Sequence, residues 1–136
     1  MRLMAHLHFK GNCREAFDAY ARLFGGEVVF AMTYGQTPEA DKSDPALKHR
    51  LAHARVDFKG QFLLGCDPPP DRYVAPQGFN VMAMIDDPQE AGRVFTSLAE
   101  RGTVIMPFQQ TFWAYRFGMC NDRFGIPWMI NCEKAP

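Results

Sequence analysis

The sequence lacks long apolar runs, an excess of one charge and paired cysteines, and each absence excludes a class of protein. No segment reaches the roughly 18 consecutive apolar residues that cross a bilayer, and residues 1–12 have no apolar core of a signal peptide. The 15 basic and 15 acidic side chains balance, without a run of Lys or Arg that would neutralise phosphates. We therefore predict a cytoplasmic protein that binds a small molecule, with no nucleic-acid or membrane partner.

The spacing of the cysteines indicates no metal site or disulfide scaffold, and several common catalytic and cofactor-binding motifs are absent. The four cysteines are far apart and have no C-x-x-C pair among them, which argues against a structural zinc site or a small disulfide scaffold; they are Cys13, Cys66, Cys120 and Cys132. No G-x-x-x-x-G-K, G-x-G-x-x-G or G-x-S-x-G motif is present. What the 136 residues do contain is 47% hydrophobic side chains, enough for one globular domain.

The chain resembles itself at an offset of 75 residues (87 − 12), which pairs segment 12–24 with segment 87–99. Both segments carry apolar side chains at helical spacing, so we predict two amphipathic helices. The predicted stripes are Ala16, Tyr20, Leu23 and Phe24 in the first helix, and Ala91, Val94, Phe95, Leu98 and Ala99 in the second.

Each predicted helix has start and stop signals of the same kind. The predicted capping boxes are Asn12 with Glu15 and Asp87 with Glu90, and the predicted stops are Gly25 with Gly26, and Gly102. Glycine suits a stop because it adopts the left-handed conformation that commonly ends a helix.

Strand-like runs precede and follow each helix. The segments 3–9 and 79–85 come before the helices, and two predicted hairpin turns, 57–60 and 122–125, match at an offset of 65 residues (125 − 60). Each half therefore reads strand, helix, strand, strand, strand. We predict an α+β fold of two tandem βαβββ modules that form a curved, cupped mixed sheet with the helices on its outer face.

The two predicted modules make up a single domain, 1–136. The first module is 1–66, the second is 79–136, and a proline-rich linker, 67–78, joins them. The change of offset gives the first half about ten more residues (75 − 65), which fall in the polar loop 35–49.

This arrangement resembles the vicinal oxygen chelate superfamily, which includes glyoxalases, bleomycin-resistance proteins and extradiol dioxygenases. The segments most similar to its PhnB-like branch are H-F-K-G-N-C-R-E-A (8–16), F-G-G (24–26), H-A (53–54), T-F-W (111–113) and D-R-F-G-I-P-W-M-I-N (122–131). Members of that branch have often carried a misleading methyltransferase label. The resemblance implies a homodimer that covers exposed sheet edges, but the same scaffold hosts many chemistries.

The resemblance also implies where a metal would bind. Metal-dependent members place His or Glu on the first and last strands of each module, at positions that correspond to Ala5, Leu64, Asn80 and Met129. Only the Asn80 amide has a donor oxygen, and it is a weak ligand. A shift of one residue gives His6, Val81, Leu63 or Gly65, and Trp128 or Ile130, which also forms no plausible shell. We expect no metal at the usual positions and predict no other cofactor.

Four histidines offer alternatives to the usual metal positions. His6 and His8 alternate onto one face of a strand, a spacing that could supply two ligands to a divalent metal, although no carboxylate or third histidine stands beside them in sequence. His49 and His53 are expected to share a face of another strand, and His53 could act as an acid or base. Hydrogen-bonded structural histidines remain the simpler interpretation.

The candidate pocket combines a few polar groups with an apolar wall. Its predicted residues are Asn80, Cys66, Asn131, His53, Trp113, Phe117 and Met129. Cys66 and Asn131 correspond at the offset of 65 residues and are expected to face the same cavity. A mainly apolar lining with few polar contacts is typical of small-molecule sites, whereas each residue taken alone also fits ordinary core packing.

Three functions are consistent with these patterns. The first is a protein of the PhnB-like branch that binds a small organic molecule in an apolar cleft, with negligible metal. The second is a metal-dependent lyase, isomerase or dioxygenase of the same superfamily whose ligands come from His6, His8 or His53. The third is an interaction module. The sequence leaves open whether the protein is an enzyme.

Overall fold

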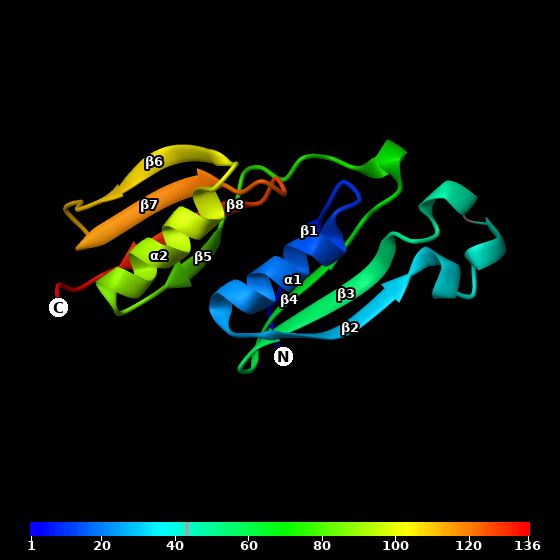
Figure 1. The fold of residues 1–136 in the computed structure, drawn as a ribbon, viewed down its shortest axis with the longest axis horizontal. Coiled ribbons are helices and arrows are strands. Elements are labelled where there is room, and N and C mark those ends of the chain that lie inside the picture. Colours follow the sequence, from blue (N-terminus) through cyan, green and yellow to red (C-terminus); the bar gives the residue numbers. More distant parts are fainter. Residues whose placement is uncertain (43) are drawn as a thin grey trace. The chain divides into compact units, whose positions relative to one another are not determined.

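The computed structural model describes residues 1–42 and 44–136, which divide into two units of the same build. The first unit is Met1–Ala75 and the second is Pro76–Pro136. Each consists of one α-helix and one four-stranded sheet in the order strand, helix, strand, strand, strand (Figure 1). The predicted α+β fold of two βαβββ modules is confirmed.

The first unit contains a mixed sheet with strand order β1-β4-β3-β2. Its elements are β1 (Ala5–His8), α1 (Cys13–Phe24), β2 (Glu27–Thr33), β3 (Leu51–Phe58) and β4 (Gln61–Cys66). β1 runs parallel to β4, and the other neighbouring strands are antiparallel. The additional loop between β2 and β3 forms short 3-10 turns at Tyr34–Gln36, Ala40–Lys42 and Pro45–Leu47.

The second unit repeats this topology with strand order β5-β8-β7-β6. Its elements are β5 (Val81–Met84), α2 (Pro88–Ala99), β6 (Thr103–Gln109), β7 (Arg116–Asn121) and β8 (Pro127–Cys132). β5 is parallel to β8, as β1 is to β4. The segment between the last strand of the first unit and β5 includes one 3-10 turn, Pro70–Arg72.

Both predicted hairpin turns are present. In the β3–β4 hairpin, the Asp57 carboxylate accepts a hydrogen bond from the Gly60 N–H (2.6 Å). In the β7–β8 hairpin, the Asp122 carboxylate is 5% exposed and accepts bonds from the N–H groups of Phe124 and Ile126 and from the Trp128 indole (each 2.9 Å). One aspartate therefore shapes each turn, and the second also fixes a core tryptophan.

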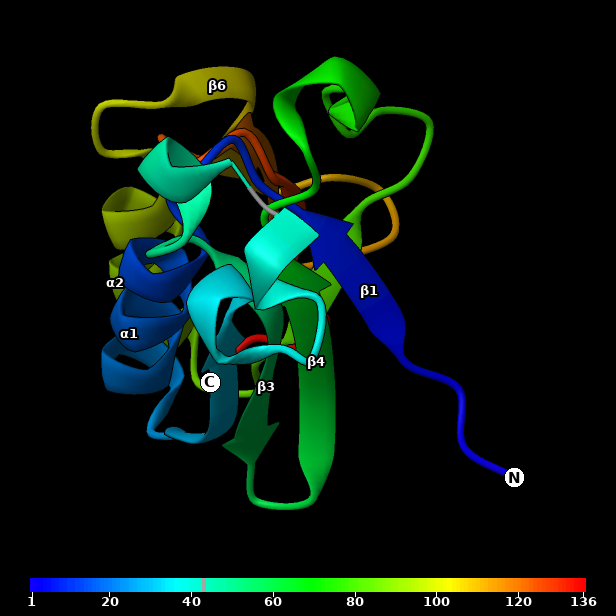
Figure 2. The ribbon, with the colours of Figure 1, turned by 90° about the vertical axis from the view of Figure 1, so that its right-hand side faces the viewer.

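Each helix covers one face of its own sheet, as Figure 2 shows for α1. A Cβ on Gly65 of β4 would lie 2.7 Å from the Phe17 ring of α1, and a Cβ on Gly118 of β7 would lie 2.7 Å from the Phe95 ring of α2. These two strand positions must therefore be glycine for the helix to pack closely. They also identify which residues of each strand point toward the helix, because side chains alternate between faces.

The helix stripes agree largely with the sequence pattern. The buried residues of α1 are Cys13, Ala16, Phe17 and Tyr20, and those of α2 are Ala91, Val94, Phe95 and Leu98. Leu23 and Phe24 are only half-buried. Phe17 replaces them in the core because it reaches the strand position left open by Gly65.

The predicted capping boxes are wrong. Asn12 makes no side-chain capping bond; the N–H groups of Gly11 and Cys13 instead donate to the Asp67 carboxylate (3.0 Å each), which arrives from the end of β4. Asp87 does cap α2 by accepting from the Gln89 N–H (3.1 Å), but Glu90 pairs with Arg93. The first N–H groups of α1 thus bond to Asp67 from another element, and Glu90 pairs with Arg93 on the next turn instead of reaching back to the start of α2.

Of the two predicted helix stops, the one after α1 is confirmed and the one after α2 is wrong. Gly25 ends α1 in the left-handed conformation (φ 71°), as expected. After α2 that conformation belongs to Arg101 (φ 59°), so the predicted role of Gly102 is wrong. Gly102 is required for another reason, because a Cβ there would collide with the Asn121 carbonyl oxygen.

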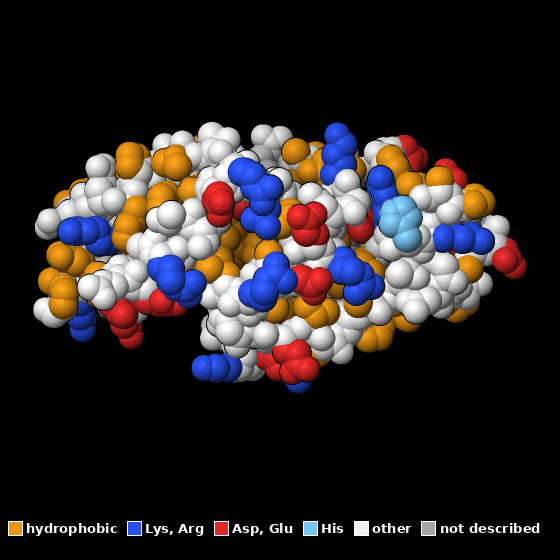
Figure 3. Space-filling view, in the orientation of Figure 1, with side chains coloured by type: hydrophobic (Ala, Val, Ile, Leu, Met, Phe, Trp, Pro, Cys, Tyr) orange, Lys and Arg blue, Asp and Glu red, His pale blue; other side chains and the backbone are white. Residues whose placement is uncertain are grey.

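The surface has a mixed character. Lys and Arg are interspersed with Asp and Glu on the face drawn in Figure 3, in keeping with the formal net charge of zero. Among residues 1–42 and 44–136, no helix combines the length and apolar character needed to cross a membrane.

All four cysteines are free thiols. Burial, followed by the nearby Asp122 charge, raises the pKa of Cys120 to about 11. Burial also raises the pKa of Cys13, with a further contribution from Asp67. Both thiols are therefore held neutral in the folded protein.

Raising the pH above about 9 is expected to destabilise the protein. The thiols of Cys13 and Cys120 lose their protons in the unfolded chain before they do in the folded chain, so the unfolded state binds fewer protons. The free energy of unfolding should then fall by on the order of 1 kcal/mol per pH unit for each thiol. Urea titrations at several pH values measure this slope. An equal slope in the Cys13→Ala/Cys120→Ala double variant would contradict the assignment.

Candidate functional site

The candidate site residues lie on the faces of the two sheets that the helices leave uncovered, called here the open faces. In the first sheet, Leu7 is paired with Gly65 on the side of α1, so the alternate residues His6, His8 and Cys66 point to the open face. Parallel pairing sets His8 directly beside Cys66. The open face of the first sheet is therefore polar.

Aromatic contacts tie three histidines of this face together. The rings of His6 and His8 are 5.4 Å apart and perpendicular, and His53 from β3 stacks on His6 with ring centroids 5.9 Å apart. The ligand atoms of His6, His8 and Cys66 all lie within 4.8 Å of one another. Parallel strand pairing thus joins the predicted His6–His8 pair to the predicted pocket residue Cys66.

The environment keeps His6 and Cys66 uncharged. Burial, followed by the charges of His8 and His53, lowers the pKa of His6. Burial, followed by Asp67, raises the pKa of the Cys66 thiol. At neutral pH, His6 consequently presents a free lone pair and Cys66 is a thiol rather than a thiolate.

Arg55 adds a cation to the same open face. Its guanidinium lies 4.1 Å from the centre of the Phe62 ring. Its Nε is buried and has no hydrogen-bond partner in the part of the chain that the structure describes.

His49 does not belong to this face. It lies in a turn before β3 begins, so the expectation that it shares a strand face with His53 is wrong.

The open face of the second sheet is apolar. Strand register pairs Met82 with Met129 and Met119 with Met129, on the side opposite α2. Five methionines occupy this side of the sheet: Met82, Met84, Met106, Met119 and Met129. Thioether side chains are flexible and polarisable, so such a surface can adapt to ligands of different shape.

Asn131 is the polar group at the centre of this apolar face. It lies on β8 between Met84 of β5 and Phe117 of β7, and it is 7% exposed. Its Oδ1 is buried and accepts no hydrogen bond from any described residue. Leaving such an oxygen unpaired costs on the order of 1–3 kcal/mol, which a ligand that donates a hydrogen bond would recover.

Trp113 contacts the same face at Phe117. Its ring meets that of Phe117 edge to face, with centroids 5.2 Å apart, and its side chain is 48% exposed. The structure thus brings together four of the predicted pocket residues, Trp113, Phe117, Met129 and Asn131, whereas Asn80 is half-buried just before β5.

The positions at which the superfamily holds its metal do not fit a metal here. In the first unit, Ala5 shares the helix-side face of Leu7, and His6 takes the open-face position beside Leu64. In the second unit, the corresponding pair is Met82 and Met129. Neither pair, an imidazole with an aliphatic side chain or two thioethers, is a donor set for the usual divalent ions.

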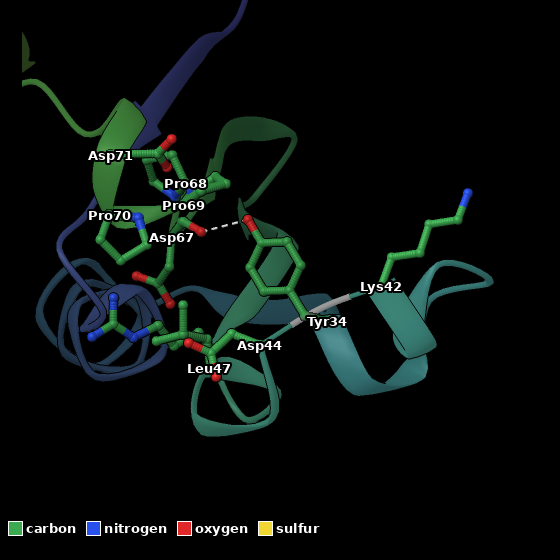
Figure 4. Close-up of a pocket in the computed structure, with 10 residues that line it drawn as sticks. Tyr34, Lys42, Asp44, Leu47, Asp67, Pro68, Pro69, Pro70 and Asp71 are labelled. Carbon is green, nitrogen blue, oxygen red and sulfur yellow. Dashed lines mark hydrogen bonds between the residues drawn. The ribbon is translucent and has the colours of Figure 1, made fainter.

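A cavity that sequence reasoning missed lies in the first unit, between the loop after β2 and the proline-rich segment after β4 (Figure 4). Its volume is about 480 Å³, and its lining includes Tyr34, Leu47, Arg50 and Pro68–Pro70. The Tyr34 hydroxyl donates to the Asp67 carbonyl (2.6 Å) at its edge. The only sequence signal for it is the longer loop of the first half, since long loops often carry function.

Comparisons with known proteins agree with this architecture. The sequence model of the 3-demethylubiquinone-9 3-methyltransferase family matches residues 1–131. Protein YjdN of Escherichia coli is 33% identical over 98% of this chain and 97% of its own. Protein PA1353 of Pseudomonas aeruginosa is 38% identical, with a TM-score of 0.90 over 99% of both chains.

More distant structures share the fold. The PhnB protein from Bacillus cereus has a TM-score of 0.83 at 24% identity, covering 97% of this chain and 99% of its own. The fosfomycin resistance protein FosX from Mesorhizobium loti has a TM-score of 0.63 at 9% identity, covering 98% and 92%. The chain therefore belongs to the PhnB-like family described as 3-demethylubiquinone-9 3-methyltransferase, within the glyoxalase-like vicinal oxygen chelate fold.

Proposed function

We propose that the protein binds a small organic molecule on the open face of the second sheet. The molecule has an apolar or aromatic body and one hydrogen-bond donor. The observation that carries this proposal is the Asn131 amide, which is flanked by Met84 and Phe117 and whose buried Oδ1 lacks a partner among the described residues. The site would bind a ligand with a hydrogen-bond donor at this position more tightly than an analogue without one, because the analogue leaves the Asn131 oxygen unsatisfied.

The surrounding side chains support the apolar part of this ligand. Met82 and Met84 are 48% and 57% exposed, although both lie on a sheet surface that would ordinarily be covered. Trp113 supplies an exposed aromatic ring beside Phe117. Exposed apolar side chains gathered on one face, with a convergent polar group, are typical of ligand sites.

The family fold is compatible with this role. FosX is a fosfomycin resistance protein by name, so at least one protein of this fold is associated with a small organic compound. In the chain described here, the usual metal positions offer no donor set, so the proposed site relies on apolar contacts and one amide. The proposed binding is noncovalent.

The test uses 4-methylphenol as the probe and 4-methylanisole as its matched partner. Both rings fit an apolar surface, but only the phenol can donate a hydrogen bond to the Asn131 Oδ1. Calorimetric titration should show that the phenol binds about tenfold more tightly, the difference that one hydrogen bond to a buried acceptor supplies. In Asn131→Leu this preference should disappear while the anisole still binds.

Two surface variants complete the test. Met84→Gln should weaken both probes, whereas Val74→Gln, which changes an exposed aliphatic side chain of the first unit, should not. Equal binding of the two probes by the unaltered protein, or equal losses in the two glutamine variants, would overturn the proposal.

A further inference from the structure

We propose that His6, His8 and Cys66 form a zinc-binding site on the open face of the first sheet. The site lies wholly within the first unit, and two of its three ligands, His8 and Cys66, stand outside the superfamily's usual metal positions. It is independent of the organic-ligand site proposed on the second sheet. It also departs from the sequence-based expectation of negligible metal.

The backbone places the three side chains together without any adjustment of the fold. His6 and His8 are two residues apart on β1, so both project from the same face. β4 runs parallel beside β1, in the register that pairs His8 with Cys66. A pair of strands, which is more rigid than a loop, therefore holds all three ligands.

The spacing of the donor atoms is suitable for a single ion. The imidazole nitrogens and the Cys66 sulfur lie within 4.8 Å of one another. In a tetrahedral zinc site, with bonds of about 2.0–2.3 Å, neighbouring ligand atoms are about 3.5 Å apart. Both histidines are exposed and can rotate by the small amount that closes this difference.

The chemistry of the three donors favours zinc over harder ions. Two imidazoles and one thiolate form a mixed nitrogen and sulfur set, which binds Zn²⁺ well, whereas Mg²⁺ and Ca²⁺ prefer oxygen ligands. Three protein ligands leave the fourth tetrahedral position free for water or a substrate atom, as in catalytic rather than structural zinc sites. The exposure of both histidines puts that position on the solvent side.

A neighbour can orient one of the ligands. His53 from β3 stacks on the His6 ring at 5.9 Å and restricts its tilt, while Phe30 packs against His53 at 5.7 Å. Contacts that fix the orientation of a ligand ring typically change metal affinity by about 10–100-fold when they are removed. We expect His53→Ala to weaken the site without abolishing it.

Cobalt alone is the probe for this site, because Co²⁺ replaces Zn²⁺ and is coloured. Titration of chelator-treated full-length protein with Co²⁺ should produce a thiolate-to-cobalt charge-transfer band that saturates at one ion per chain. Stoichiometric Zn²⁺ should displace the cobalt and remove the band. Cys66→Ser should abolish the band, and His6→Ala and His8→Ala should each weaken binding at least tenfold.

Matched controls separate ligation from nonspecific binding. His49→Ala removes a histidine outside the cluster and should leave the band and the affinity unchanged. Thermal unfolding of each variant checks that the fold is retained, and Cys66→Ser changes only one atom. The absence of a charge-transfer band in the unaltered protein, or its survival in Cys66→Ser, would overturn the proposal. Equal weakening by His49→Ala and His8→Ala would also do so.

Discussion

Replacing Asp67 with Ala is expected to lower the free energy of unfolding by about 3–5 kcal/mol. The Asp67 carboxylate is 1% exposed and accepts bonds from the backbone N–H groups of Gly11, Cys13 and Leu51, all at 3.0 Å. Alanine leaves these three donors without partners, and each buried unsatisfied donor costs on the order of 1–3 kcal/mol. Urea unfolding followed by far-ultraviolet circular dichroism measures the loss.

Two variants make this prediction specific. Asp67→Asn keeps one acceptor oxygen and should lose an intermediate amount of stability. Asp71→Ala removes an exposed aspartate from the neighbouring turn and should change stability by no more than about 0.5 kcal/mol. A loss below about 1 kcal/mol for Asp67→Ala would show that Asp67 does not hold α1, β3 and β4 together.

Gly102→Ala is expected to destabilise the protein by about 3 kcal/mol. A Cβ at this position would collide with the Asn121 carbonyl oxygen and press on the backbone of Asp122. Backbone atoms at a strand end cannot yield as a flexible side chain would, so β6 and β7 must separate locally. Overpacking of this kind typically costs about 1–3 kcal/mol, and the rigid neighbours place Gly102 at the upper end.

Gly25→Ala is the comparison variant because its cost comes from the backbone conformation and not from a collision. Gly25 also follows a helix, but it has a positive φ of 71°, and a Cβ added there would have nothing within 4 Å. Alanine at this position meets only the cost of the left-handed conformation, about 1–2 kcal/mol. If the two variants lost the same stability, the steric explanation for Gly102 would be wrong.

The fold could be predicted because its signals are local and occur twice. Helical spacing of apolar residues, a hairpin turn near Gly60 and another near Gly125 were sufficient to give the element order. Asp67 could not be found in this way, because its N–H partners Gly11 and Cys13 lie 56 and 54 residues away in sequence. The interaction that replaces the predicted cap at Asn12 depends on tertiary structure alone.

The sequence predicted many of the residues of the candidate sites, but not which of them lie next to one another in the fold. Alternation along β8 placed Asn131 and Met129 on one face, as expected from the sequence. The join between His8 and Cys66 depends on parallel pairing of β1 with β4, which no local pattern reveals. The face of β1 was likewise undetermined until the contact between Gly65 and Phe17 fixed which side meets the helix.

The two open faces differ in chemistry although the sheets share one topology. Cys66 on β4 and Asn131 on β8 occupy equivalent register positions, paired with His8 and Met84 respectively. The first pair supplies ligands for a soft or borderline metal, and the second supplies an amide in an apolar setting. Duplication therefore preserved the scaffold, while the open-face residues of the two halves diverged.

The central claim is that the second sheet carries the ligand site. The most direct test is to record the NMR signals of the methyl groups of the eight methionines during titration with 4-methylphenol. The protein is labelled at the methionine methyl groups, and each resonance is assigned with a Met→Leu variant. We predict that Met82, Met84 and Met129 shift and saturate together, while Met4 and Met32 of the first unit stay unchanged. Shifts confined to the first unit, or shifts that are equal and unsaturable throughout the chain, would contradict a ligand site on the second sheet.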